Sequence, residues 1–361
     1  MRGTVCLVTN IPSPYRVPVF DRLQLMLRQQ GIELLVLYLS QTEPNRSWKF
    51  PNINHNYVIL PGKTFSVGNA FFHWNSSALI TQLRKSKPIA VITSGFDLTM
   101  LQAFLWSRIS RVVHLSFSDG TLDSERNLGL LRRVARRLVV KNSRSVLGAS
   151  RKTLSLYQHY GALPQNCFES CLCVDNDRYQ TRDQAKEFDL LYVSQFIPRK
   201  MPEFIVEVMV ELGRDYSLQV VGDGHLREWF INELTREGVG YEYAGFVQPD
   251  KIPASFQKAR LLLFPTRSDP WGVVANEACA AGVPVLTTSA AGAAGELIIH
   301  GENGFVLPPE ARVWADHVRQ LLNDKELYSN MCRNALSRVR GFTFEKASEG
   351  ILNAVMASLK K

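Results

Sequence analysis

Short apolar runs rich in β-branched residues alternate along this chain with stretches of helical periodicity, and the rhythm restarts in the second half. Parallel strands need crossover connections, so this alternation predicts an α/β fold with open parallel sheets covered by helices. The expected strands are residues 5–9, 34–39, 89–93, 112–117, 145–147, 188–193, 218–221, 241–244, 261–264 and 283–286. The expected helices include residues 19–30, 76–86, 203–212, 226–237 and 314–322.

A polar stretch without core periodicity, residues 175–187, separates the two halves. The chain has 361 residues, 45% of them hydrophobic and 21% charged, which is enough for two packed cores and too apolar for disorder. We expect a first domain at 1–175, a second at 188–343, and a last helix at about 344–361 that packs back on the first. Ligands of such sheets bind beyond the carboxyl ends of the strands, which favours a site in a cleft between the domains.

Positive charge is concentrated in the first half of the chain. Residues 1–150 hold 19 Lys and Arg against 7 Asp and Glu, a net charge of +12, whereas the remainder carries −3 of the total of +9. Residues 130–144 repeat cations at four-residue spacing opposite Leu, Val and Ala, the pattern of a helix that lies on an anionic membrane. A solvated surface helix is the alternative. No nucleic-acid-binding motif accompanies these cations, so nucleic acid is not an expected partner.

No run reaches the roughly 18 consecutive apolar residues of a membrane-spanning helix, and the first residues are typical of a strand and not of a signal peptide. We therefore expect a cytoplasmic protein. Six cysteines in so long a chain do not predict a disulfide framework. The cysteine cluster at 167–173 and the pair Asp175 and Asp177 are minor candidates for a metal site, and we expect no bound metal.

The most specific stretch, residues 261–285, combines a buried strand, a loop and a helix. Pro270 and Gly272 mark the turn. The first amides of a helix have no intrahelical acceptor, so residues 272–275 offer N–H groups to a phosphate without a metal. Glu277 lies more than a turn further in, where it can accept hydrogen bonds from a ribose diol. The alternative is that this acid only complements the helix dipole.

The spacing from Asp269 to Glu277 resembles the acid-x7-Glu motif of retaining glycosyltransferase family 4, the glycosyl transferases group 1. Other segments similar to this family are residues 192–200, 220–224, 245–247, 291–296 and 301–305. The resemblance spans most of the carboxyl-terminal half. It implies the GT-B fold, in which two Rossmann-like domains face each other across a cleft and the second binds a nucleotide sugar.

The resemblance also implies roles for individual residues. Glu277 is expected to hold the nucleotide ribose, and Asp269 is expected to contact a sugar hydroxyl as a catalytic residue. The other donor-binding residues implied are Gly272, Val273 and Val274 for the diphosphate, Trp271 beside them, and Phe246 and Val247 for the base.

Members of this family usually carry a Gly-Arg pair followed by a Lys, two cations that grip the diphosphate. This chain has Ser194 and Gln195 at the pair, followed by Arg199 and Lys200. Gln195 occupies a donor-site position without supplying the charge. Lys200 keeps the family position and is the expected catalytic cation. Arg199 is either a second donor-site cation or a solvated surface residue.

In the first half, residues 10–18 resemble the family's opening loop without its paired glycines. Tyr15 and Arg16 in this loop are expected on the acceptor side of the cleft, where Arg16 can meet a phosphate; an ordinary surface arginine is the alternative. Asp119 follows a later strand and is expected to orient a sugar as a catalytic carboxylate. An Asp-Gly turn is the alternative for Asp119.

The function implied by the resemblance is retaining transfer of a hexose from a nucleotide-diphosphate sugar to a lipid-linked or polysaccharide acceptor. UDP-glucose or a similar UDP-hexose is the expected donor, with GDP-mannose next. Lys200 and the helix amides are expected to stabilise the negative charge of the leaving group, so no metal or other cofactor is expected. We expect peripheral attachment to the inner face of the cell membrane. The alternatives are an epimerase or phosphorylase of the same fold and a non-catalytic basic membrane adaptor.

Overall fold

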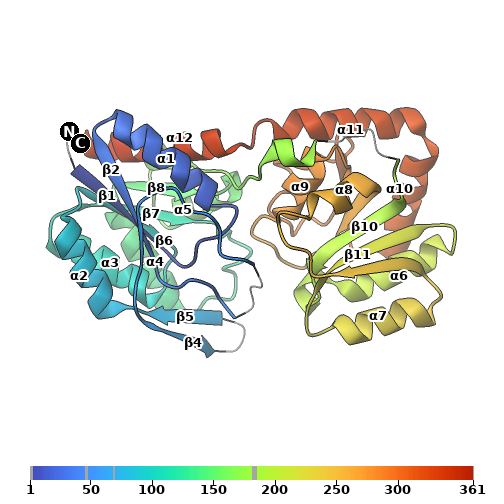
Figure 1. Ribbon diagram of the computed structural model, residues 1–361, viewed down its shortest axis with the longest axis horizontal. Helices are drawn as coiled ribbons and strands as arrows, with labels where there is room; N and C mark the ends of the chain where they lie inside the picture. The colour runs from blue at the N-terminus through green and yellow to red at the C-terminus, as the bar shows by residue number, and fades with distance from the viewer. Residues whose placement is uncertain (1–2, 45–47, 68–69, 181–184, 361) are drawn as a thin grey trace. The chain divides into compact units, whose positions relative to one another are not determined.

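The computed structural model describes residues 3–44, 48–67, 70–180 and 185–360, which divide into two compact units. Unit 1 comprises Met1–Leu172 together with Phe344–Lys361, and unit 2 comprises Cys173–Thr343. Each unit contains one parallel sheet with helices packed on it, so the predicted α/β class with two Rossmann-like sheets is confirmed. Figure 1 labels the elements of both units.

The sheet of unit 1 has seven parallel strands in the order β3-β2-β1-β6-β7-β8-β9. The strands are β1 (Gly3–Thr9), β2 (Ile32–Tyr38), β3 (Tyr57–Ile59), β6 (Ala90–Ser94), β7 (Val113–Ser118), β8 (Ser145–Gly148) and β9 (Cys167–Glu169). The side chains of residues 5–8 and 90–92 are fully buried. Strands covered on both faces need apolar residues at successive positions, which explains the continuous apolar runs in the sequence.

Helices cover both faces of this sheet. The helices of unit 1 are α1 (Val17–Gln29), α2 (Ser76–Ser86), α3 (Leu98–Ile109), α4 (Leu130–Asn142), α5 (Arg151–His159) and α12 (Phe344–Leu359). Figure 1 shows α1 and α12 side by side on one face and α2 and α3 on the other. The Ser348 hydroxyl of α12 donates to the carbonyl oxygen of Val19 at 2.8 Å, and Ser358 donates to the hydroxyl of Ser145 at 2.8 Å. The last helix of the chain is therefore part of the core of unit 1.

A two-stranded antiparallel hairpin precedes α2. It consists of β4 (Lys63–Val67) and β5 (Ala70–Trp74), with Lys63 opposite Trp74. The buried Asn75 follows directly, and its side-chain amide donates to the carbonyl oxygens of Leu39 and Leu60 at 3.1 and 3.0 Å. That side chain ties the end of the hairpin to the segments that follow β2 and β3.

The sheet of unit 2 has six parallel strands in the order β12-β11-β10-β13-β14-β15. The strands are β10 (Phe188–Gln195), β11 (Ser217–Asp223), β12 (Gly240–Gly245), β13 (Ala259–Phe264), β14 (Val285–Thr287) and β15 (Gly304–Val306). The helices are α6 (Pro202–Leu212), α7 (Arg227–Arg236), α8 (Pro253–Lys258), α9 (Val274–Ala280), α10 (Ala311–Asn323) and α11 (Lys325–Val339).

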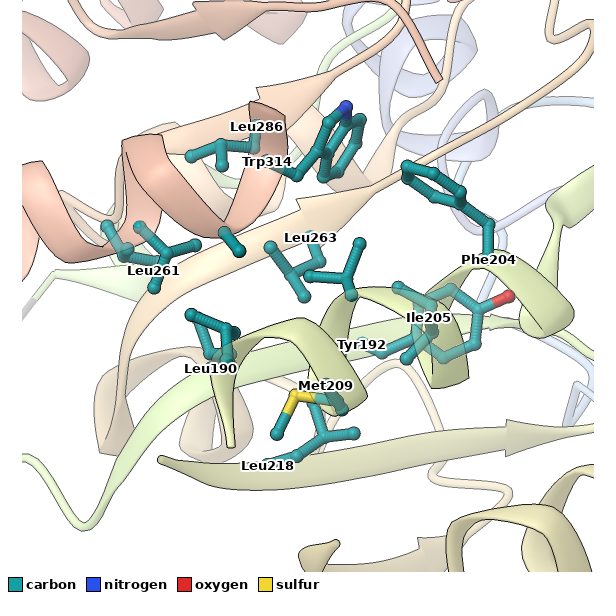
Figure 2. Close-up of a cluster of buried hydrophobic side chains, with 14 of the residues drawn as sticks. Leu190, Tyr192, Phe204, Ile205, Met209, Leu218, Leu261, Leu263, Leu286 and Trp314 are labelled. Carbon is teal, nitrogen blue, oxygen red and sulfur yellow. The ribbon is translucent and has the colours of Figure 1, made fainter. Parts of the chain in front are cut away.

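The core of unit 2 lies where α6 and α10 pack on the central strands. Figure 2 shows Leu261 and Leu263 of β13 in one cluster with Ile205 of α6 and Trp314 of α10. The indole N–H of Trp314 donates to the carbonyl oxygen of Pro308 at 2.8 Å, which satisfies the one polar atom of this buried side chain.

The polar stretch 175–187 lies within unit 2 as far as it is described. Residues 176–179 form the short 3-10 helix η2 (Asn176–Tyr179), and residues 181–184 lie outside the described residues. The chain passes between the units at Leu172–Cys173 and again at Thr343–Phe344. Among the described residues, no helix combines the length and the apolar character needed to cross a bilayer.

Candidate active site

Lys200 lies just after the carboxyl end of β10, at the end of the short 3-10 helix η3 (Pro198–Lys200). Pro198 suits the first position of this turn, and Met201 adopts a left-handed conformation (φ 53°) before α6 begins. The Tyr192 hydroxyl donates to the carbonyl oxygen of Lys200 at 2.8 Å. The ammonium lies 5.1 Å from the ring centroid of Phe264, on the neighbouring strand β13. Tyr192 thus fixes the backbone of Lys200, and Phe264 packs against its ammonium.

Asp269 forms an ion pair with that ammonium, through its Oδ2 atom. The Lys200 and Asp269 side chains are only 12% and 13% exposed. Burial would raise the pKa of Asp269, but the charges of Lys200 and Arg199 and the N–H of Trp271 outweigh it and hold the pKa below its ordinary value. Asp269 is therefore ionised at neutral pH.

Arg199 approaches the same carboxylate from a more exposed position. Its Nη1 lies 3.6 Å from Oδ2 of Asp269 and donates to the carbonyl oxygen of Ser268 at 2.6 Å. Two cations thus face one carboxylate, which leaves one positive charge in excess. An anion that arrives at this cluster meets two neighbouring cations in a partly desolvated setting.

Gly272 forms the turn that leads from Asp269 into α9. Its φ of +91° favours glycine, and a Cβ atom here would lie 2.2 Å from the ring of Phe264. The N–H groups of Ala275 and Asn276 are bonded to the carbonyl oxygens of Gly272 and Val273. Within the described part of the chain, residues 272–274 have no acceptor for their own N–H groups. The turn therefore offers three amides beside the cation cluster.

Glu277 lies on α9 and is 4% exposed. Its Oε1 accepts a hydrogen bond of 2.9 Å from the hydroxyl of Tyr179, at the end of η2. Sequence reasoning missed Tyr179. The available signal was an aromatic residue in an otherwise polar stretch, which indicates a residue packed against something distant.

Trp271, which lies between Asp269 and Glu277 in the sequence, is buried within unit 2. It is 1% exposed, its indole N–H donates to Oδ1 of Asn276 at 2.6 Å, and its ring packs on Phe342 with centroids 5.5 Å apart. The backbone N–H of the same residue donates to Oδ1 of Asp269 at 3.2 Å. Trp271 thus supports the loop from inside and reaches the acid through its backbone.

Residues 174–338 match the family model described as Glycosyl transferases group 1. Unit 2 is a glycosyl transferases group 1 domain. The matched residues include Asp269, Gly272 and Glu277, so the buried ion pair, the glycine turn and the Tyr179-bound carboxylate all lie within the matched segment.

Relatives of this group 1 domain include the D-inositol 3-phosphate glycosyltransferase of Nocardia farcinica, 26% identical over 247 residues, which cover 62% of this chain and 54% of that protein. The chain spans about half the length of the curated relatives it matches. Anabaena HepE in complex with UDP is similar in structure, with a TM-score of 0.79 at 17% identity over 99% of this chain and 100% of that one. Sucrose-phosphate synthase of Thermosynechococcus elongatus has a TM-score of 0.76 at 16% identity over 98% of each chain. These likenesses establish the GT-B fold.

Other expected donor-site residues lie at the carboxyl ends of strands in the group 1 domain. Gln195 is the last residue of β10 and pairs in register with Asp223 of β11. Phe246 and Val247 follow β12, and Phe246 is 41% exposed. Both segments are therefore at the sheet edge where the ion pair and the glycine turn also lie.

The expected acceptor-side residues belong to unit 1. The Arg16 guanidinium lies 4.6 Å from the ring centroid of Phe117 and donates to the carbonyl oxygens of Ser170 and Cys171 at 3.3 and 3.5 Å. Tyr15 packs edge-on against Trp48. Asp119 is exposed directly after β7. Arg16 thus has a structural role in joining the opening loop to the chain beyond β9, which its sequence context did not predict.

Metal-binding clusters of three or more His, Cys, Asp or Glu side chains do not occur among the described residues. Cys167, Cys171 and Cys173 are reduced cysteines. Burial raises the pKa of Cys167, which disfavours the thiolate that a metal requires.

Proposed function

We propose that this protein is a retaining, metal-independent glycosyltransferase that moves a hexose from a UDP-hexose to a lipid-linked or polysaccharide acceptor. The observation that carries the proposal is the buried pair of Lys200 and Asp269 in a group 1 domain, with Arg199 beside it. The positive charge in excess at this cluster suits the diphosphate of a nucleotide sugar. Anabaena HepE, a protein of the same fold, is known in complex with UDP, which favours uridine as the base.

In the proposed reaction, the bond between the anomeric carbon and the diphosphate oxygen breaks, and the same carbon forms a bond to an acceptor oxygen. The departing diphosphate oxygen takes up the proton of the acceptor hydroxyl. Lys200, Arg199 and the amides of residues 272–274 stabilise the negative charge of the leaving group. Asp269 contacts a hydroxyl of the transferred sugar, and Asp119 orients the sugar from unit 1.

Glu277 is the proposed ribose-binding residue, and its replacement by alanine is expected to raise the Kd for UDP about 10- to 100-fold. A hydrogen bond to a charged group contributes about 1.5–3 kcal/mol, and each 1.4 kcal/mol is about tenfold in affinity. Isothermal titration with UDP measures the change. Glu302→Ala, at an exposed position of the same unit, is the control. Equal UDP affinity in the two variants contradicts the role of Glu277.

The proposal as a whole is tested by a thermal-shift screen of the full chain against UDP, UDP-glucose and GDP-mannose. Binding of a nucleotide sugar raises the midpoint of unfolding, because the ligand stabilises only the folded state. Release of the nucleoside diphosphate only when an acceptor is present distinguishes transfer from epimerisation. A protein that no nucleotide sugar stabilises contradicts the proposal and favours an adaptor role.

We also propose that α4 attaches the protein to an anionic membrane at the inner face of the cell membrane. Its apolar side chains Leu130, Leu131, Val134 and Leu138 are 77%, 86%, 56% and 53% exposed. Residues four apart share a helix face, so these side chains form one exposed stripe. The exposed cations on this helix are Arg132, Arg133, Arg137 and Lys141, which suit anionic lipid headgroups, whereas Arg136 pairs with Glu125 and is only 16% exposed.

Glutamate at both Leu130 and Leu131 is expected to weaken binding to phosphatidylglycerol vesicles by at least about tenfold, because a buried leucine contributes about 1.5–3 kcal/mol. Co-sedimentation with vesicles measures the effect. Leu163→Glu is the control, since Leu163 is also exposed (55%) and lies outside α4. Wild-type protein that stays in solution with these vesicles contradicts the proposal.

A further inference from the structure

The helix η2 is fixed in place by a distant segment of unit 2. The side-chain amide of Asn176 donates to the carbonyl oxygens of Val339 and Phe342, at 3.2 Å each, at and just beyond the end of α11. η2 also packs against α8 and α9. The position of its last residue, Tyr179, is therefore determined by several elements of the same unit.

Tyr179 and Glu277 form a buried pair. Tyr179 is 4% exposed, and its ring packs edge-on against Phe256 of α8 with centroids 5.8 Å apart. Its hydroxyl donates to Oε1 of Glu277 at 2.9 Å. Because the ring is packed and the carboxylate is equally buried, this hydrogen bond restricts the rotation of the Glu277 carboxyl group about its terminal bond.

The chemical nature of Tyr179 suits a carboxylate that must bind hydroxyl groups. A lysine or arginine at this place would neutralise the carboxylate and compete with the neutral donors of a ligand. A phenol donates one hydrogen bond without cancelling charge, and an ionised carboxylate accepts at about four positions. Tyr179 can therefore orient Glu277 while the carboxylate keeps its attraction for a vicinal diol.

We infer that Tyr179 is a positioning residue that makes the nucleotide site select ribonucleoside over 2′-deoxyribonucleoside diphosphates, by fixing the carboxylate of Glu277. The inference rests on the proposed function, because it takes Glu277 as the ribose-binding residue. The 2′-hydroxyl is the group that the two nucleotide classes do not share. A carboxylate that is oriented less firmly would adjust to the remaining 3′-hydroxyl, and the selectivity would fall.

The test is isothermal titration of the full chain with UDP and with 2′-deoxy-UDP, and the readout is the ratio of the two Kd values. The wild-type protein is expected to favour UDP. Tyr179→Phe removes one oxygen and keeps the buried ring, and it is expected to reduce that preference about tenfold. The ratio is decisive because a general loosening of unit 2 weakens both nucleotides alike and leaves the ratio unchanged.

Tyr328→Phe is the matched control, since the Tyr328 hydroxyl donates to the carbonyl oxygen of Arg260 at 3.2 Å in the same unit. It is expected to keep the wild-type ratio. Glu277→Gln is expected to lower the ratio as Tyr179→Phe does. The double variant with both substitutions is expected to lower the ratio little further, because the two residues act together. A wild-type ratio in Tyr179→Phe overturns the inference and leaves the proposed function standing. Wild-type protein that binds neither nucleotide overturns both.

Discussion

Replacing Lys200 with alanine is expected to lower the kcat of sugar transfer by about 10²- to 10³-fold, with a smaller effect on the KM for the donor. Removal of one group that stabilises developing negative charge typically has an effect of this size. The ammonium lies in a partly desolvated position against Phe264, where its interaction with the departing diphosphate is stronger than in water. Its contribution therefore grows as the glycosidic bond breaks.

Steady-state kinetics with a saturating donor measures this effect. Lys200→Arg keeps a cation at the position and is expected to retain more activity than alanine. Lys325→Ala, at an exposed position at the start of α11, is the control for loss of a lysine in the same unit. If Lys200→Ala turned over at the wild-type rate, the leaving-group charge would have to be stabilised elsewhere.

Asparagine in place of Asp269 is expected to have two opposite effects: turnover falls at least about 10²-fold, whereas free UDP binds about tenfold more tightly. Turnover falls because the proposed contact with the sugar hydroxyl loses its charge. UDP affinity rises because Lys200 and Arg199 no longer face a carboxylate that competes with the diphosphate. Few mechanisms other than release of a paired cation produce tighter product binding together with lower turnover.

The pH dependence of the Asp269→Asn effect follows from the lowered pKa of Asp269. The carboxylate stays charged below the ordinary pKa of an aspartate, so the ion pair stabilises the folded state fully above that ordinary pKa and is lost only as the pH falls through the lower folded value. The gain in UDP affinity is therefore expected at pH 6 and at pH 8 alike. Without ligand, the variant is expected to unfold at a lower temperature, because two buried or partly buried cations lose their partner.

Titration of UDP into wild-type and Asp269→Asn protein measures this gain. Asp316→Asn, which removes an exposed carboxylate paired with Arg319 on α10, is the control. Weaker UDP binding in Asp269→Asn would contradict the competition between carboxylate and diphosphate for Lys200.

Local patterns predicted the fold, and they drew attention to the segment that contains Asp269 and Glu277. The apolar runs identified the central strands of both sheets because those strands are covered on both faces. The resemblance to the acid-x7-Glu motif singled out Asp269 and Glu277, and both lie in the strand, turn and helix that follow one another directly at one edge of the sheet. Both inferences needed only residues that are close in the sequence.

Contacts between distant residues were not predicted. Tyr179 and Glu277 are 98 positions apart, and Arg16 and Ser170 are 154 apart, so no local pattern connects them. The hairpin β4–β5 lies between the short strand β3 and the helix α2, and its sequence has no strong hydrophobic periodicity. The interior position of Trp271 depends on Phe342, which follows α11. In each case the partner is supplied by the tertiary fold.

The arrangement of the units along the chain has a consequence for biosynthesis. The polypeptide of unit 2 is one uninterrupted segment, whereas unit 1 uses both ends of the described chain. A ribosome therefore completes unit 2 while the sheet of unit 1 still lacks α12. In the folded protein, the α12 side chains Ala347, Ile351 and Val355 are buried. Until α12 emerges, the apolar face that it covers in unit 1 stays open to water or to a chaperone.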